Sequence, residues 1–106
     1  MQAESMFCSD GHVLFTAGEP AENLYQLVDG SLQQIGPMGE RTIKSDSYFQ
    51  GFIDPASFFC DGLHETTVRA DAFAAIAVIP RSSREAVVRN FPEMVLNLLR
   101  ESNGLG

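Results

Sequence analysis

Basic residues are scarce in this sequence. Its 106 residues include seven lysines and arginines against fourteen aspartates and glutamates, which gives a formal net charge of −7 at pH 7. Eleven of the acidic residues and only three of the basic ones lie within residues 1–80. Because an acidic surface repels a phosphate backbone, we expect no direct binding to nucleic acid.

Cysteines and long apolar runs are also rare. Cys8 and Cys60 lie far apart and match neither a metal-ligand spacing nor a disulfide framework, so we expect two free thiols. The longest apolar run, Ala72 to Ile79, is far shorter than the roughly 20 residues of a membrane span. The polar N-terminus lacks the pattern of a secretory signal. These features favour a cytoplasmic protein that does not enter a membrane.

Residues that support catalysis are few. His12 and His64 are the only histidines, and no His-x-His motif occurs, so a metal site of the kind found in other jelly rolls is not expected. No set of serine, cysteine and histidine has a spacing typical of nucleophilic catalysis. The sequence therefore predicts a protein that is not an enzyme and carries no cofactor.

Short strands separated by turns fill the chain up to Pro80. The length is that of one domain, which we divide into a β-roll at 1–80 and C-terminal helices at 81–106. The predicted strands are 12–16, 24–28, 31–35, 41–44, 66–70 and 74–79. Asp29-Gly30 predicts a hairpin between the second and third of them. Short strands with Gly and Pro between them indicate an antiparallel sandwich or barrel.

A helical period replaces this pattern after Pro80. Ser82 and Glu85 have the spacing of a capping box that would begin a first helix. Pro92 is suited to the first turn of a second helix, because its missing N–H is not needed there. The second helix carries an apolar stripe of Met94, Val95, Leu98 and Leu99. The stripe either packs against the roll or forms a homodimer seam.

Three motifs carry a resemblance to a known family. They are Gly-x-x-Leu-Phe-x-x-Gly-Glu at 11–19, Leu-Tyr-x-Leu-Val-x-Gly at 24–30, and a strand ending in Ile79-Pro80 ahead of a helix and a Pro-Glu pair. Over residues 6 to 100 the chain resembles the cyclic-nucleotide-binding domain of catabolite-activator and Fnr-type regulators. The resemblance implies an eight-stranded antiparallel jelly roll with short C-terminal helices. It also implies glycines with positive φ at Gly11, Gly18 and Gly30, and cAMP or cGMP as the ligand.

The ligand loop of that family reads Phe-Gly-Glu, a helical turn, and then Arg-Ser/Thr-Ala. The arginine pairs with the cyclic phosphate, the helical turn offers backbone N–H groups, and the glutamate accepts a ribose hydroxyl. Alignment from Val68-Arg69-Ala70 puts His64, Glu65 and Thr66 at the Arg-Ser/Thr-Ala positions. The glutamate position falls on Phe52 if Gly51 is the anchor, and on Asp54 if no gap is allowed. The resemblance thus gives six candidate ligand residues: Gly51, Phe52, Asp54, His64, Glu65 and Thr66.

This loop departs from the family pattern in its charge. No lysine or arginine occurs between Lys44 and Arg69. If Val68 and Ala70 face inward, Arg69 points away, because side chains alternate along a strand. A lost charged hydrogen bond is worth about 1.5–3 kcal/mol, or one to two decades in affinity. We therefore expect cAMP or cGMP to bind weakly, or a different small ligand to take the site.

Two residues of the loop allow alternative interpretations. A free imidazole has a pKa of about 6.5, so if His64 replaces the arginine, phosphate binding should strengthen as the pH falls. Alternatively, His64 caps a loop or faces solvent. Asp54 is either a ribose contact or the N-cap of a helix that starts at Pro55. For the whole domain, the alternative to a ligand sensor is a protein-interaction or dimerisation module with a vestigial pocket.

Overall fold

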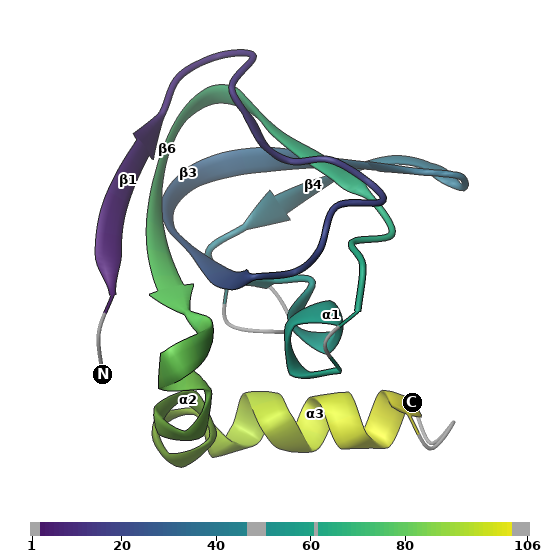
Figure 1. Cartoon of the computed structure of the whole chain (residues 1–106). Helices are drawn as coiled ribbons and strands as arrows, with labels where there is room; N and C mark the ends of the chain where they lie inside the picture. The colour runs from purple at the N-terminus through teal and green to yellow at the C-terminus, as the bar shows by residue number, and fades with distance from the viewer. Residues whose placement is uncertain (1–2, 47–50, 61, 103–106) are drawn as a thin grey trace.

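Strands form the larger part of the regular secondary structure, and the helices gather at one end of the molecule (Figure 1). The computed structural model describes residues 3–46, 51–60 and 62–102. The strands are β1 (Glu4–Cys8), β2 (Val13–Phe15), β3 (Asn23–Gly36), β4 (Gly39–Lys44), β5 (Phe52–Ile53) and β6 (Thr67–Pro80). The helices are α1 (Pro55–Phe59), α2 (Arg84–Asn90) and α3 (Pro92–Ser102), with a 3₁₀ turn at Arg81–Ser83. None of the described helices is long and apolar enough to cross a bilayer.

The described strands form one antiparallel sheet in the order β1-β6-β3-β4, with β2 added on β6 and β5 on β3. The long β3–β6 pair runs from Asn23 opposite Pro80 to Ile35 opposite Thr67. The two strands curve together, so that the sheet wraps around its core (Figure 1). The mainly β, antiparallel class with short C-terminal helices is therefore confirmed. The described residues form six strands where eight were expected.

The hairpin predicted at Asp29-Gly30 is wrong. The two residues lie inside β3, and the register against β6 shifts on each side of them. Gly30 has φ of +89°, and a Cβ added to it would lie 2.1 Å from the Phe73 backbone oxygen. A glycine with positive φ serves a bulge as well as a turn, so the dipeptide could not distinguish them. The predicted strands 66–70 and 74–79 are likewise parts of one continuous strand, β6.

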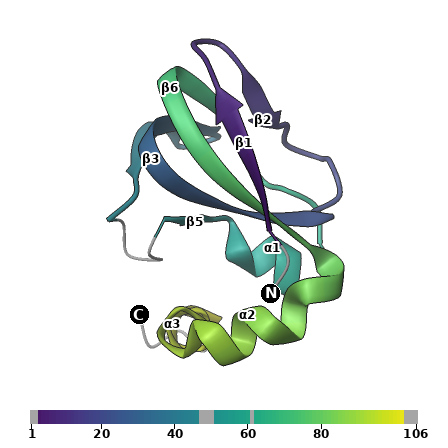
Figure 2. The same cartoon turned by 90° about the vertical axis from the view of Figure 1, so that its left-hand side faces the viewer.

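Two clusters of buried apolar residues hold the structure together. One fills the roll and includes Phe15, Leu27, Leu32 and Ile76. The second lies where the roll meets the helices and consists of Leu24, Phe52, Phe58, Ile79, Val87 and Met94. Its members come from β3, β5, α1, β6, α2 and α3, so it fixes all three helices beneath the roll (Figure 2).

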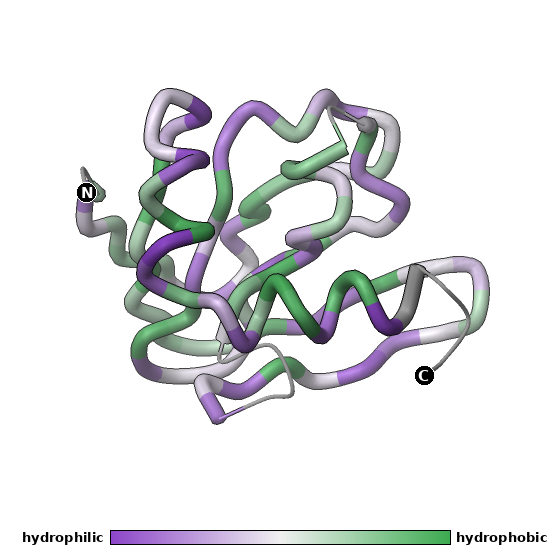
Figure 3. Tube along the Cα trace, turned by 90° about the horizontal axis from the view of Figure 1, so that it is seen from below, coloured by the Kyte–Doolittle hydropathy of each residue, from purple (hydrophilic) through white to green (hydrophobic). Residues whose placement is uncertain are grey.

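The C-terminal helices follow the prediction except at their start. The capping box at Ser82 and Glu85 is wrong, because the chain enters α2 through a 3₁₀ turn and Ser83 is the N-cap, without a side-chain cap bond. α3 begins at Pro92 as expected. Apolar residues alternate with polar ones along it (Figure 3).

The apolar stripe of α3 is divided between two environments. Met94 is fully buried, and Val95 and Leu98 pack against the second cluster. Leu99 is 54% exposed and Leu96 is 51% exposed. The predicted packing of the stripe against the roll is therefore confirmed for three of its four residues. Leu96 and Leu99 form a separate exposed pair on the helix.

Candidate functional site

Gly51 and Phe52 anchor the start of the candidate loop. The Leu27 N–H donates to the Gly51 carbonyl at 2.8 Å, and Gly51 has φ of +83°. A Cβ there would lie 2.5 Å from the Leu27 oxygen, so the close backbone approach requires glycine. Phe52 is buried and packs edge-on against Phe91, with ring centroids 4.9 Å apart. Its side chain belongs to the core, so Asp54 is the better candidate for the glutamate position.

Asp54 occupies the N-cap position of α1, and the helix begins at Pro55 as predicted. Its backbone is left-handed, with φ of 47° and ψ of 50°, which is uncommon for a residue other than glycine. Its carboxylate makes no cap bond to the helix. Oδ2 lies instead 2.8 Å from Nδ1 of His64. The helix-cap interpretation is thus right about the position of Asp54 and wrong about its contact.

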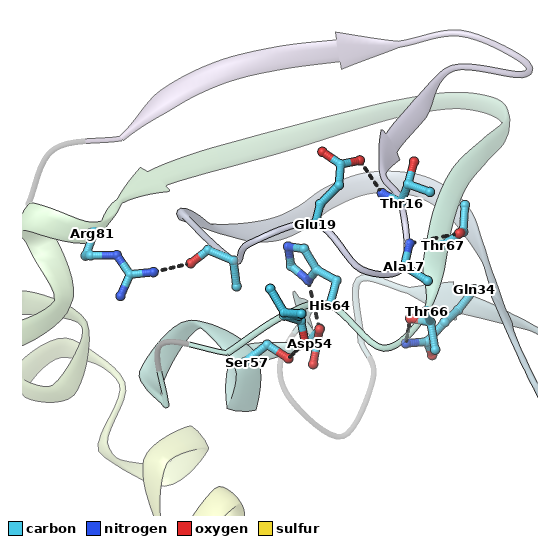
Figure 4. A network of polar contacts seen from close by, with 12 residues as sticks. Thr16, Ala17, Glu19, Gln34, Asp54, Ser57, His64, Thr66, Thr67 and Arg81 are labelled. Atoms are coloured by element: carbon cyan, nitrogen blue, oxygen red, sulfur yellow. Dashed lines mark hydrogen bonds and ion pairs between the residues drawn. The ribbon is translucent and has the colours of Figure 1, made fainter.

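His64 is buried, and its ring points toward Asp54 (Figure 4). Its ring stacks on the Phe15 ring, with centroids 3.6 Å apart and planes 13° apart. Its backbone N–H donates to the Glu19 carbonyl at 2.9 Å, and its carbonyl accepts from the Gly18 N–H at 2.8 Å. His64 does not face solvent, so that part of the alternative is wrong, whereas its backbone bonds do tie it to the loop after β2. Neither Phe15 nor Glu19 was a candidate residue, since both belong to a motif that indicated only strand and turn.

The Asp54–His64 contact defines the proton positions on the ring. An ionised carboxylate can only accept, so Nδ1 of His64 carries the hydrogen of this bond. In the neutral ring the second nitrogen, Nε2, is then an acceptor. Only 3% of the His64 side chain and 16% of the Asp54 side chain are exposed. Asp54 therefore fixes the tautomer of a ring that has little access to water.

Glu65 and Thr66 lie in a different environment from His64. Both line a cavity of about 550 Å³ against the β3–β4 hairpin, together with Gln34, Gly36, Pro37, Met38, Gly39, Glu40 and Arg41. Gln34 Nε2 donates to Thr66 Oγ1 at 3.0 Å, and Arg41 Nε donates to Gln34 Oε1 at 2.7 Å. Neither Asp54 nor His64 is among the described residues that line this cavity. The structure thus splits the six candidates instead of gathering them in one pocket.

The nearby cations are engaged elsewhere. Val68 and Ala70 are buried, as predicted, and Arg69 between them reaches within 3.9 Å of Glu40. The Arg81 guanidinium donates to the Ala21 carbonyl and lies over the Phe58 ring, 5.8 Å from its centroid. Arg81 therefore ties the start of the C-terminal helices to the loop after β2 and to α1.

Two ionisable groups outside the loop have shifted pKa values. Hydrogen bonds donated by Gln33 and Ser31 hold the pKa of Asp71 below its ordinary value. Burial raises the pKa of the Cys8 thiol, whereas Cys60 is exposed. In the described part of the chain no three His, Cys, Asp or Glu side chains come together as metal ligands would.

Comparison with known proteins places this geometry in context. A family model described as cyclic nucleotide-binding domain matches residues 6–91. No protein of curated function matches the chain in sequence. Among solved structures, the chain is similar to the catabolite activator protein of Thermus thermophilus, at 19% identity and a TM-score of 0.72, covering 95% of this chain and 52% of that one.

Two further structures show the same fold. The sensor domain of the transcriptional regulator DNR from Pseudomonas aeruginosa is 18% identical, with a TM-score of 0.69, covering 97% of this chain and 71% of that one. The cAMP-bound PfPKA-R (141–441) is 13% identical, with a TM-score of 0.77, covering 97% of this chain and 36% of that one. The chain thus spans about a third to 71% of these neighbours.

Proposed function

The chain belongs to the cyclic nucleotide-binding domain family, and from this premise we propose that it is a ligand-sensing regulatory module in which cAMP or cGMP binds weakly. The observation that carries the proposal is the state of His64. The residue aligned with the family's phosphate-binding arginine is buried and bonded to Asp54, the residue aligned with its ribose-binding glutamate. The two side chains that would bind a nucleotide are bonded to each other instead.

The expected loss of affinity follows from charge. An arginine fork gives a phosphate two donors and a permanent positive charge. His64, whose Nδ1 is already bonded to Asp54, gives it neither. The missing charged hydrogen bond is worth about 1.5–3 kcal/mol, or one to two decades in dissociation constant.

The wider role is part of the same proposal. We place the module in the cytoplasm as a single unit over residues 1–106, without catalysis, cofactor or direct contact with nucleic acid. The match to a family of ligand-binding domains and the cAMP in the PfPKA-R neighbour support a regulatory role.

Isothermal titration calorimetry with cAMP, cGMP and 5′-AMP tests the proposal. We expect cAMP or cGMP to bind about one to two decades more weakly than it would to a site that holds the arginine. 5′-AMP lacks the cyclic diester and controls for non-specific nucleotide binding. Absence of binding by both cyclic nucleotides would contradict the sensor function.

The exposed pair on α3 favours a second candidate, a dimerisation module with a vestigial pocket. Leu96 and Leu99 are about half exposed, although they lie on a helix whose other apolar residues are packed. Light scattering should then show a dimer that Leu99→Asp dissociates without lowering the melting temperature. Leu98→Asp is unsuitable for this purpose, because Leu98 packs against the core and its loss would test folding. A wild-type monomer would exclude this candidate.

A further inference from the structure

We propose that the Asp54–His64 contact is an autoinhibitory latch, in which Asp54 competes with an incoming phosphate for His64. This inference rests on the proposed function and reverses the role that alignment assigns to Asp54. Alignment makes Asp54 a residue that helps to hold the ligand. The geometry makes it the group that the ligand must overcome.

The latch has three structural components. The first is the contact itself, with Nδ1 and Oδ2 2.8 Å apart and both side chains largely shielded from water. The second is the stack of His64 on Phe15, which leaves the ring little freedom to turn toward another partner. The third is the left-handed backbone of Asp54, where the chain enters α1. Asp and Asn adopt this conformation more readily than other residues with a side chain, and here it accompanies the bond of Asp54 to His64.

Asp54 opposes an anion in two ways. It keeps the proton on Nδ1, so that Nε2 of the neutral ring presents a lone pair to any phosphate oxygen. The Asp54 carboxylate also places a negative charge beside the ring, and this charge repels an approaching phosphate. A phosphate therefore gains full benefit from His64 only when the contact with Asp54 is broken.

The other charged groups around His64 do not offset Asp54. The loop between β2 and β3 contributes Glu19, whose Oε1 accepts from the Thr16 N–H. The next residue along the chain is Glu65, which is exposed and lines the cavity against the β3–β4 hairpin. β2 and α1 contribute no charged side chain. The neighbourhood is therefore acidic, and Asp54 is the carboxylate in contact with the ring.

Asp54→Asn is the variant that separates the two roles of this residue. Asparagine accepts the left-handed conformation readily, so the start of α1 should be retained. Its neutral amide can donate to Nδ1, which moves the ring hydrogen to Nε2, where a phosphate can accept it. Asp10→Asn removes the same charge from the turn between β1 and β2 and serves as the matched control. Asp54→Gly is the second variant, in case the asparagine protein does not fold.

Calorimetric titration of cAMP into the wild type and these variants at about pH 7.5 gives the test. We expect Asp54→Asn to bind at least about tenfold more tightly than the wild type, and Asp10→Asn to match the wild type. Equal or weaker binding by Asp54→Asn would overturn the latch and leave weak nucleotide sensing intact. Weaker binding would, in addition, support the ribose contact.

A second readout decides the matter if no variant binds a nucleotide, a result that would refute the proposed function. Inorganic phosphate is then titrated while the His64 ring resonances are followed by NMR. Movement of these resonances in Asp54→Asn but not in the wild type supports the latch, because phosphate reaches the ring only once the carboxylate is gone. The same response in both proteins, or none in either, overturns it.

Discussion

Separating Asp54 from His64 should destabilise the ligand-free protein, and a double-mutant cycle can measure by how much. His64→Phe keeps an aromatic ring to stack on Phe15 and removes Nδ1. Asp54→Gly removes the carboxylate and tolerates the left-handed backbone. Each single variant also has costs of its own, such as an unpaired carboxylate or a more flexible chain. The cycle subtracts these costs and leaves the pairwise term.

The size of this term follows from the contact. A hydrogen bond between a charged and a neutral group contributes about 1.5–3 kcal/mol to stability. The pair is at most 16% exposed on either side, so solvent screens it far less than a surface pair. We therefore expect a coupling free energy of about 1.5–3 kcal/mol. For a domain of this size, each kcal/mol of lost stability lowers the melting temperature by about 4–8 °C.

Urea denaturation of the four proteins, followed by circular dichroism, measures the cycle. The denaturant dependence of the unfolding free energy must remain the same in all four, since a change would mean that the unfolded or native state had altered. A coupling below about 0.5 kcal/mol, within the usual error of additivity, would show that the contact does not stabilise the loop. The latch would then lack an energetic basis.

Three other predictions concern the rest of the molecule. A left-handed backbone costs a residue other than glycine about 1–2 kcal/mol. Gly51→Ala should lower the free energy of unfolding by more than this, because its Cβ would lie 2.5 Å from a backbone oxygen. Urea denaturation measures the loss, with Gly18→Ala as the control, because a Cβ at Gly18 meets nothing within 4 Å. A thiol reagent should label Cys60 in the folded protein and Cys8 only after unfolding, as counted by mass spectrometry. The lowered pKa of Asp71 stabilises the folded protein above the pKa that Asp71 has in the unfolded state. This stability is lost as the pH falls through the folded-state pKa. Asp71→Asn should therefore remove the pH-dependent loss of stability that Asp71 contributes to acid denaturation.

Much of the fold could be predicted because its signals are local. The change of period at Pro80, the helix that begins at Pro92 and the inward-facing Val68 and Ala70 all depend on residues close in sequence, and the structure confirms them. The bend at Gly30 could not be separated from a hairpin, because its geometry depends on Phe73 in a partner strand.

The site was predictable in position but not in contacts. Counting back from Ala70 aligned His64 with the family's arginine, and the structure places His64 beside Asp54, another candidate of the same loop. Its pairing with Asp54, ten residues earlier, and its stack on Phe15 depend on how three separate segments pack. No local pattern encodes that packing. The burial of Phe52 in the second cluster likewise depends on Phe91 and the C-terminal helices.

The central claim is that a His64–Asp54 pair stands where the family has a cationic clamp, and the affinity for cAMP tests it most directly. The variant His64→Arg with Asp54→Glu restores the family's residue types at both positions. Calorimetry should show that the restored protein binds cAMP about one to two decades more tightly than the wild type. A wild-type protein that already binds cAMP as tightly as the restored one would contradict the claim.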